Sequence, residues 1–180
     1  MNEFEYSSED EVLDLVDSQD RVVGSMKRSD IFRQRKNNYR AVIALIINEQ
    51  GKLLITRRAA DKPILPGALH CVGGCVKSGE TYEQAIIREI YEEVALDLKV
   101  QPYHYLGQLT PEHDKSAGYV AVYKIPVVDT VQLHYHQSDF SAIFWLSVDQ
   151  LTDKIVNGEK VATNLPILMR RFFCARSSEG

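Results

Sequence analysis

Three glutamates, Glu89, Glu92 and Glu93, stand close together in a segment whose apolar residues recur at helical spacing. Glu92 is three residues and Glu93 four residues after Glu89, so the three side chains project toward overlapping regions beside one helix. Carboxylates at such spacings repel one another and destabilise a helix by roughly 0.2–0.5 kcal/mol per pair. We therefore expect a positive partner beside them.

A hard divalent cation meets this requirement, because carboxylate oxygens suit Mg²⁺ and Mn²⁺. Mg²⁺ is commonly shared between a few carboxylates and the phosphates of a substrate. A metal ion bound in this way polarises phosphoryl oxygens and lowers the pKa of a coordinated water, which then acts as the nucleophile. The residues thus predict Mg²⁺, with Mn²⁺ as a substitute, and a phosphorylated small-molecule substrate.

An acidic helix face is more often an ordinary solvated surface. The residues that precede this helix argue against that interpretation. A double glycine ending at Gly74, the additional acid Glu80, and Arg88 directly before the first carboxylate stand at fixed distances from it. A surface helix has no need for such positions.

Hydrophobic patterning predicts the elements that must position these residues. The expected elements are a hairpin of residues 13–17 and 21–24, a short helix over 28–35, buried antiparallel strands over 41–47 and 53–55, loops around a short strand within 59–79, the acidic helix over 80–94, strands over 119–125 and 142–146, and helices over 149–156 and 165–173. His134 and His136 alternate on a further predicted strand, but two histidines without a third ligand are usually surface or packing residues.

The segment from Gly74 to Leu96 resembles the Nudix box, the strand-loop-helix signature of the Nudix hydrolase family. The matching positions are Gly74, Glu80, Arg88, Glu89, Ile90, Glu92, Glu93 and Leu96. One position departs, since Ala95 stands where the family usually has glycine; alanine weakens the preference for a left-handed helix cap but removes no ligand. By overall pattern the resemblance covers residues 11–173.

The resemblance implies an α+β protein with the Nudix fold, a mixed β-sheet sandwiched between α-helices. It implies that four groups bind the metal ion, namely the carboxylates of Glu89, Glu92 and Glu93 and the backbone carbonyl of Gly73. It also implies a catalytic set of Glu89, Arg88 and Glu80, in which the last two hold the ligands in place. The activity implied is cleavage of a diphosphate linkage in a nucleoside diphosphate derivative or similar small molecule.

The stretch over residues 53–67 is similar to isopentenyl-diphosphate isomerases and their hydrolase relatives within the superfamily. By that similarity Arg58 and Lys62 would meet the substrate's phosphates, although a surface pair at a sheet edge is the other interpretation. Isomerisation requires a cysteine and a glutamate, whose positions align with Gly73 and about Gly118, and neither glycine can transfer a proton.

An isomerase nevertheless stays an alternative, because Cys71 or Cys75 together with Glu112 would supply these groups under a shifted alignment. A further alternative is a module that binds a nucleotide diphosphate without turnover. The general base is also open: the candidates are Glu89, Glu112, Asp114 and Asp139. Asp139 stands before a predicted strand, where aspartate is also a common loop residue.

The composition suits one soluble domain over residues 1–180, with residues 1–10 and 177–180 loosely held. The formal net charge of −4 disfavours binding to nucleic-acid polymers or anionic membranes. Three cysteines, an acidic N-terminus and no apolar run of membrane-spanning length predict a cytoplasmic protein. We also expect a homodimer, formed by the N-terminal hairpin and the C-terminal helix that carries Ile167, Leu168, Phe172 and Phe173.

Overall fold

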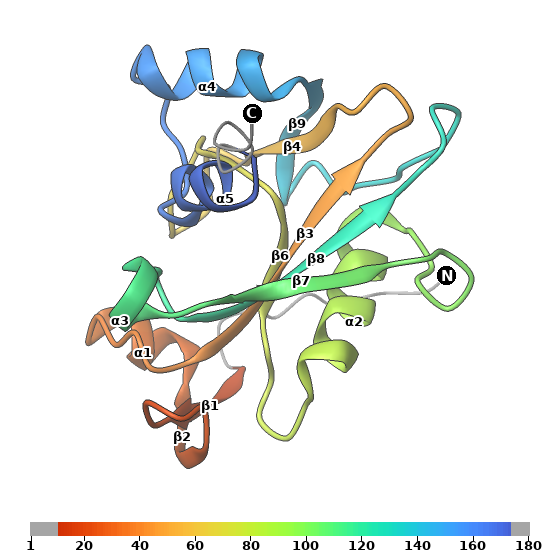
Figure 1. Cartoon of the computed structure of the whole chain (residues 1–180). Helices are drawn as coiled ribbons and strands as arrows, with labels where there is room; N and C mark the ends of the chain where they lie inside the picture. The colour runs from red at the N-terminus through yellow and green to blue at the C-terminus, as the bar shows by residue number, and fades with distance from the viewer. Residues whose placement is uncertain (1–10, 174–180) are drawn as a thin grey trace, which may run out of the picture.

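The structure, a computed structural model, describes residues 11–173, so the ends predicted to be loosely held lie outside the described residues. Helices flank a mixed sheet on both of its faces (Figure 1). The elements in chain order are β1 (Val12–Val16), β2 (Val22–Lys27), α1 (Arg28–Arg33), β3 (Arg40–Ile47), β4 (Leu53–Arg58), β5 (Leu69–His70), β6 (Val72–Cys75), α2 (Tyr82–Val94), β7 (His104–Leu109), α3 (Pro111–Asp114), β8 (Tyr119–Pro126), β9 (Phe140–Leu146), α4 (Val148–Val156) and α5 (Asn164–Phe172).

The seven-stranded sheet has the order β5-β4-β3-β8-β7, with β6 also paired to β3 and β9 also paired to β4. β3 and β8 are parallel, whereas the other pairs in this sheet are antiparallel. β3 and β4 share the pair Ile47–Leu53 next to their turn and then diverge. The N-terminal half of β3 is therefore available to β6, which places Gly73 beside Ile43 and Gly74 beside Val42.

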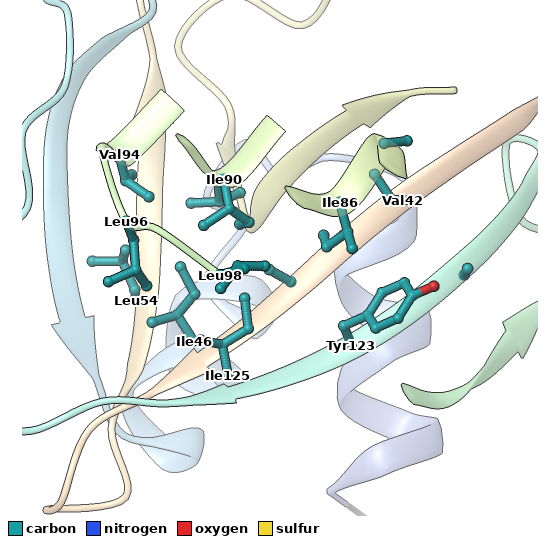
Figure 2. Packing of buried hydrophobic residues seen from close by; sticks show 14 of the residues in the cluster. Val42, Ile46, Leu54, Ile86, Ile90, Val94, Leu96, Leu98, Tyr123 and Ile125 are labelled. Atoms are coloured by element: carbon teal, nitrogen blue, oxygen red, sulfur yellow. The ribbon is translucent and has the colours of Figure 1, made fainter. Parts of the chain in front are cut away.

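Both faces of the sheet are buried, which explains the continuous apolar run of β3. Successive side chains of a strand point to opposite faces, so Val42 and Ile46 belong to the core under α2 while Leu45 belongs to the core under α4 and α5. Figure 2 shows Ile86 and Ile90 of α2 packed over the first of these faces. The predicted mixed sheet between helices is confirmed.

Helix α2 has defined ends. The side chain of Thr81 accepts a hydrogen bond from the backbone N–H of Gln84, and the side chain of Gln84 accepts one from the backbone N–H of Thr81. Such a capping box contributes roughly 1 kcal/mol to helix stability. At the other end Ala95 adopts a left-handed conformation with φ of 57°. The left-handed cap is thus kept without glycine, at a cost of about 1 kcal/mol.

The N-terminal hairpin forms a separate two-stranded sheet that is attached to the loop before α2. The carboxylate of Asp14 accepts hydrogen bonds from Ser78 Oγ at 2.6 Å and from the Gly79 N–H at 3.1 Å. Leu13 and Ile31 form a third core cluster with Tyr39 and Cys75. This cluster joins the hairpin and α1 to β3 and β6.

Some expectations about individual elements were wrong. His134 and His136 lie in an irregular segment and not on a strand, and β7 and α3 were not anticipated. Ile167 and Leu168 are 9% and 1% exposed and pack beneath the sheet, so the apolar face of α5 is covered within the chain and does not offer the expected dimer surface. Within residues 11–173 no helix is both long and apolar enough to cross a membrane.

Candidate active site

Two consecutive glycines bring β6 into contact with α2. A Cβ atom on Gly74 would lie 2.5 Å from the carboxylate of Glu89. At Gly73 a Cβ atom would collide with the backbone carbonyl of Val42, and φ there is +149°, which side chains rarely adopt. The Glu89 carboxylate therefore occupies the volume that a side chain at position 74 would need, and it is buried there, with Glu89 4% exposed.

Arg88 connects the loop before α2 to the acids on the helix. Its Nε and Nη2 atoms donate to the two oxygens of Glu80, each at 2.7 Å, in a bidentate pair. Its Nη1 atom donates to Glu89 at 2.7 Å and to Glu92 at 3.3 Å, and Nη2 also donates to the carbonyl of Cys75 at 3.1 Å. Planar, bidentate pairing of this kind orients side chains as well as neutralising them. Arg88 and Glu80 thus hold Glu89 and Glu92 in fixed positions.

The acids differ in how well their charge is compensated. Burial would raise the pKa of Glu80, but hydrogen bonds from Arg88 and from the Lys77 N–H lower that pKa below its usual value. Burial raises the pKa of Glu89 in spite of Arg88. The pKa of Glu93 is well above its usual value because of burial and the nearby Glu89, although the Gly73 N–H donates to its carboxylate at 3.0 Å. Negative charge is therefore in excess beside β6.

A cavity of about 480 Å³ opens above these acids. Its lining residues are Glu11, Arg28, Ser29, Phe32, Arg58, Lys62, Pro63, Ile64, Gly73, Gly74, Cys75, Glu89, Glu93, Asp139 and Phe140. The structure thus brings Arg58 and Lys62 to the same cavity as Glu89 and Glu93. By contrast, Arg88 and two acids bound to it, Glu80 and Glu92, are not among the lining residues.

Arg58 is held by the loop that follows β4, and Lys62, in that loop, is held by the residue before β9. Arg58 donates from Nε to the carbonyl of Ile64 at 2.8 Å, and Lys62 donates from Nζ to Asp139 at 2.6 Å. Asp139 lines the same cavity as Glu93 and contributes to raising the pKa of that carboxyl group. Arg58, Lys62 and Asp139 therefore form a mixed-charge group beside Glu93.

The remaining candidate bases are engaged elsewhere. Glu112 accepts a hydrogen bond from the hydroxyl of Tyr119 at 2.7 Å. Asp114 forms an ion pair with Arg171 at 2.5 Å and accepts the backbone N–H of Thr110 at 2.9 Å. Neither acid lines the cavity, so Asp139 is the candidate outside α2 that reaches it.

Among the described residues, Cys71, Cys75 and His70 do not form a reactive group. Burial raises the pKa of the Cys71 thiol to about 12 and that of Cys75 to about 11. Burial lowers the pKa of His70 to about 3, with a smaller effect from Arg58. These side chains are neutral at physiological pH, and of the three only Cys75 lines the cavity.

The carboxylates of Glu89, Glu92 and Glu93 are chemically suited to a hard divalent cation. In the structure, however, they do not surround a common point. Among the described residues no three Asp, Glu, His or Cys side chains are placed so that they could hold a metal ion. In the structure Arg88 instead binds Glu89 and Glu92, while the Gly73 N–H binds Glu93. A divalent cation would favour the ionised forms of Glu89 and Glu93, whose pKa values burial raises.

The N-terminal residues of the cavity were not anticipated from the sequence. Glu11, Arg28, Ser29 and Phe32 carry no motif and precede the Nudix box by more than forty residues in the sequence. They reach the cavity because the first strand of the hairpin pairs with two distant segments: Leu13 pairs with Lys77 before α2, and Leu15 pairs with Tyr39 before β3. A pattern in one sequence offers no signal for such long-range placement.

Comparison with known proteins agrees with the fold and the box. The NUDIX domain family matches residues 37–165. An uncharacterized Nudix hydrolase of Nostoc sp. is 40% identical over 164 residues, covering 91% of this chain and 96% of the relative. The crystal structure of DR0079 from Deinococcus radiodurans superposes with a TM-score of 0.85 at 35% identity, covering 91% of this chain and 99% of that chain.

The likeness to isomerases is more limited. An isopentenyl-diphosphate Delta-isomerase of Klebsiella pneumoniae is 32% identical over 92 residues, which is 50% of each protein. The matches to Nudix hydrolases are stronger in identity and extend over nearly the whole chain. The match of the family to most of the sequence, together with these relatives, shows that the chain belongs to the Nudix hydrolase family.

Proposed function

We propose that this Nudix hydrolase uses Mg²⁺, replaceable by Mn²⁺, to cleave the diphosphate linkage of a nucleoside diphosphate derivative or similar small molecule. Membership of the family supports a hydrolase of phosphoanhydride-type substrates. The observation that carries the finer proposal is the charge at the cavity. Two acids with raised pKa values, Glu89 and Glu93, line the same cavity as the cations Arg58 and Lys62.

In this mechanism Glu89, Glu92, Glu93 and the carbonyl of Gly73 would hold the metal ion. When bound, the ion supplies neutralisation of phosphate charge and a water of lowered pKa. Arg88 would keep Glu89 and Glu92 oriented, and Glu80 would in turn orient Arg88 through its bidentate pair.

Arg58 and Lys62 would bind the substrate's phosphates by charge and hydrogen bonding. The general base is Glu89 or Asp139, because both line the cavity while Glu112 and Asp114 do not. A phosphate on Lys62 would compete with Asp139, which now accepts its hydrogen bond at 2.6 Å. Substrate binding would then leave Asp139 able to accept a proton from the attacking water.

The test is product release from a panel of nucleoside diphosphates, nucleoside triphosphates, dinucleotides, nucleotide sugars and prenyl diphosphates, measured with Mg²⁺ and with EDTA. A variant with Glu92→Gln and Glu93→Gln is compared with Glu83→Gln, a control on the exposed side of the same helix. We expect selective turnover that EDTA and the double substitution abolish and that Glu83→Gln retains. Absence of turnover with every compound, despite Mg²⁺ binding, would favour the non-catalytic module, and conversion of isopentenyl diphosphate would favour the isomerase.

We also propose a cytoplasmic location and a homodimer. Cys71 and Cys75 are free thiols, which suits a reducing compartment. Val22 and Val23 on β2 are 53% and 64% exposed, so the hairpin keeps an apolar edge for a second copy. Light scattering should give the mass of a dimer, and a monomeric mass at micromolar concentration would rule it out.

A further inference from the structure

The side chain of His70 is buried near the cavity and has one nitrogen atom that no described residue binds. His70 is 8% exposed, and among the described residues its Nε2 atom has no hydrogen-bond partner. A buried polar atom without a partner is uncommon in folded proteins and costs free energy. We propose that His70 is a positioning residue whose Nε2 atom accepts a hydrogen bond from the guanidinium of Arg58 when Arg58 binds a phosphate group. The inference rests on the proposed function and adds a residue that acts through Arg58.

The pairing of three strands places His70 beside Arg58. His70 of β5 pairs with Thr56 of β4, so Arg58, two residues after Thr56, lies on the same face of the sheet and diagonal to His70. Phe140 of β9 pairs directly with Arg58. The rings of His70 and Phe140 contact each other, with centroids 5.3 Å apart. The side chains of His70, Arg58 and Phe140 therefore start from one patch of the sheet.

This patch lies on the face of the sheet that α2 covers. Leu54, two residues before Thr56 on β4, belongs to the core beneath α2, as Figure 2 shows, and Phe140 belongs to the same core. Arg58 and Phe140 line the cavity, whereas His70 is not among the lining residues. The charge of Arg58 lowers the pKa of His70, which agrees with the short separation that the strand pairing gives. His70 can therefore act on a ligand in the cavity through Arg58.

The unpaired nitrogen of His70 is an acceptor. Burial lowers the pKa of His70 to about 3, so the ring is neutral at physiological pH. A hydrogen bond with the backbone of Cys71 acts on this pKa in the opposite direction. The ring donates an N–H in that bond, because only donation favours the protonated ring. A neutral imidazole has a single N–H, so Nε2 carries a lone pair.

Arg58 is a donor that suits this lone pair. Its Nε atom donates to the carbonyl of Ile64 at 2.8 Å, which holds one side of the guanidinium. An acceptor on the sheet in addition to this carbonyl fixes the plane of the guanidinium, so that its outer N–H groups face a phosphate in a bidentate pair. His70 provides such an acceptor without charge. A carboxylate at the same place would neutralise Arg58 and weaken its attraction for an anion.

Other roles of His70 fit less well. A general base has to reach the attacking water, and His70 does not line the cavity. The positive charge of Arg58 beside the ring disfavours a metal ion at Nε2, and no group of three His, Cys, Asp or Glu side chains within residues 11–173 could hold one. A role in packing alone would leave the cost of the buried nitrogen without a benefit.

The experiment measures binding of methylenediphosphonate, a diphosphate analogue that is not hydrolysed, by calorimetry in the presence of Mg²⁺. His70→Phe keeps a planar ring against Phe140 but removes the acceptor. We expect it to lower the affinity about tenfold, the effect of losing one hydrogen bond to a charged group. His70→Gln should stay within about threefold of the parent protein, because its amide oxygen replaces Nε2 as an acceptor. If His70→Phe does not fold, His70→Leu takes its place.

Arg58→Gln distinguishes a positioning role from a structural one. Since His70 acts through Arg58, His70→Phe should cause no further loss of affinity in an Arg58→Gln protein. A general structural defect would instead lower the affinity equally in both backgrounds. Leu69→Val is the matched control, because Leu69 precedes His70 in β5 and is fully buried in the core on the opposite face. This control should keep the affinity of the parent protein, and thermal unfolding should show that each variant is folded.

Four results would overturn the proposal. They are failure of the parent protein to bind the analogue, unchanged affinity in His70→Phe or in Arg58→Gln, equal losses from His70→Phe in the two backgrounds, and a loss in His70→Gln as large as that in His70→Phe. Turnover is measured separately. A protein that binds the analogue through Arg58 and His70 but hydrolyses no compound would contradict the hydrolase and keep this inference, whereas turnover with independent effects of the two residues would contradict this inference alone.

Discussion

Two arginines, Arg40 and Arg88, organise polar networks that both include residues of α2, and the networks differ in charge balance. Arg40 forms an ion pair with Asp20 at 2.7 Å. The Asp20 carboxylate also accepts the hydroxyl of Tyr82 at 2.9 Å and the amide of Gln108 at 3.0 Å. One positive and one negative group are therefore joined by neutral partners. This balanced network ties the hairpin turn to β3, α2 and β7.

The network of Arg88 has the opposite character. A single guanidinium contacts three carboxylates, those of Glu80, Glu89 and Glu92, while Glu93 stands beside them. Burial and repulsion from neighbouring carboxylates raise the pKa of Glu89 and Glu93. A network that serves only stability has no reason to keep this excess of negative charge. The difference supports the proposal that the Arg88 network receives a cation, whereas the Arg40 network is balanced without one.

The largest effect that would sharpen this comparison is expected from Glu93→Gln. The amide can still accept the Gly73 N–H but contributes no charge to a metal ion. Mutation of a residue that only hydrogen-bonds a metal ligand lowers metal affinity or activity by about 10–100-fold. Loss of a ligand itself should therefore lower Mg²⁺ affinity and kcat by at least about a hundredfold. Calorimetry with Mg²⁺ and steady-state kinetics would measure both. Glu83→Gln should be silent, and unchanged Mg²⁺ affinity in Glu93→Gln would remove Glu93 from the site.

A smaller loss is expected from Gly74→Ala. The new methyl group would lie 2.5 Å from the Glu89 carboxylate and would displace it from its buried position. We expect Mg²⁺ affinity and kcat to fall by about 10–100-fold, as for other changes that misplace a ligand. Gly24→Ala is the matched control, because a Cβ there meets nothing within 4 Å. Equal kinetics of the two variants would show that the position of Glu89 does not matter.

The pH dependence of stability should separate the two networks further. A carboxyl with a raised pKa in the folded state binds its proton more tightly there, so the metal-free protein should lose stability as pH rises from the usual value of 4.5 through the raised value. Each unit of the shift corresponds to about 1.4 kcal/mol. Mg²⁺ binds the ionised forms, so its stabilisation should grow over the same range.

Thermal unfolding with Mg²⁺ and with EDTA across this range would measure the effect. In a variant with Glu89→Gln and Glu93→Gln, the difference in thermal stability between Mg²⁺ and EDTA should hardly change with pH. If the Arg88 network were as balanced in charge as the Arg40 network, the difference in stability between Mg²⁺ and EDTA would not change with pH in the parent protein either. A rise of metal-free stability with pH would contradict the direction given for these acids.

The parts of the fold that the sequence could predict are those with local signals. Helix α2 was predicted because its acids, its apolar face and its glycines stand within one short segment, and β3 because it is buried on both sides. Strand β7 was missed because His104, Tyr105 and Leu106 are all exposed and show no apolar alternation. An edge strand with little burial has no pattern to read.

The opposite error occurred around His134 and His136, which were expected to lie on a strand. Val131, Leu133 and Tyr135 alternate with polar residues and do pack against the α2 core, yet this segment is not part of a strand. Alternation predicts which side chains are buried but not whether the backbone has a neighbouring strand to pair with. In the site, the roles of the box residues stay predictions, and the wall formed by α1 depends on contacts between distant segments that one sequence does not reveal.

The smallest effect, and the most discriminating, is expected from Asp20→Asn. The amide keeps the size of the carboxylate but removes the charge that compensates Arg40. The side chains of Arg40 and Asp20 are 18% and 24% exposed. We expect the free energy of unfolding to fall by about 1 kcal/mol, as for partly exposed ion pairs. Mg²⁺ affinity should stay within about twofold, because changes without shared partners combine independently. Denaturant unfolding and Mg²⁺ calorimetry on the same preparation give both values. A loss of Mg²⁺ affinity as large as that of Gly74→Ala would mean that the two networks act as one unit, and charge balance would then no longer distinguish the structural cluster from the functional one.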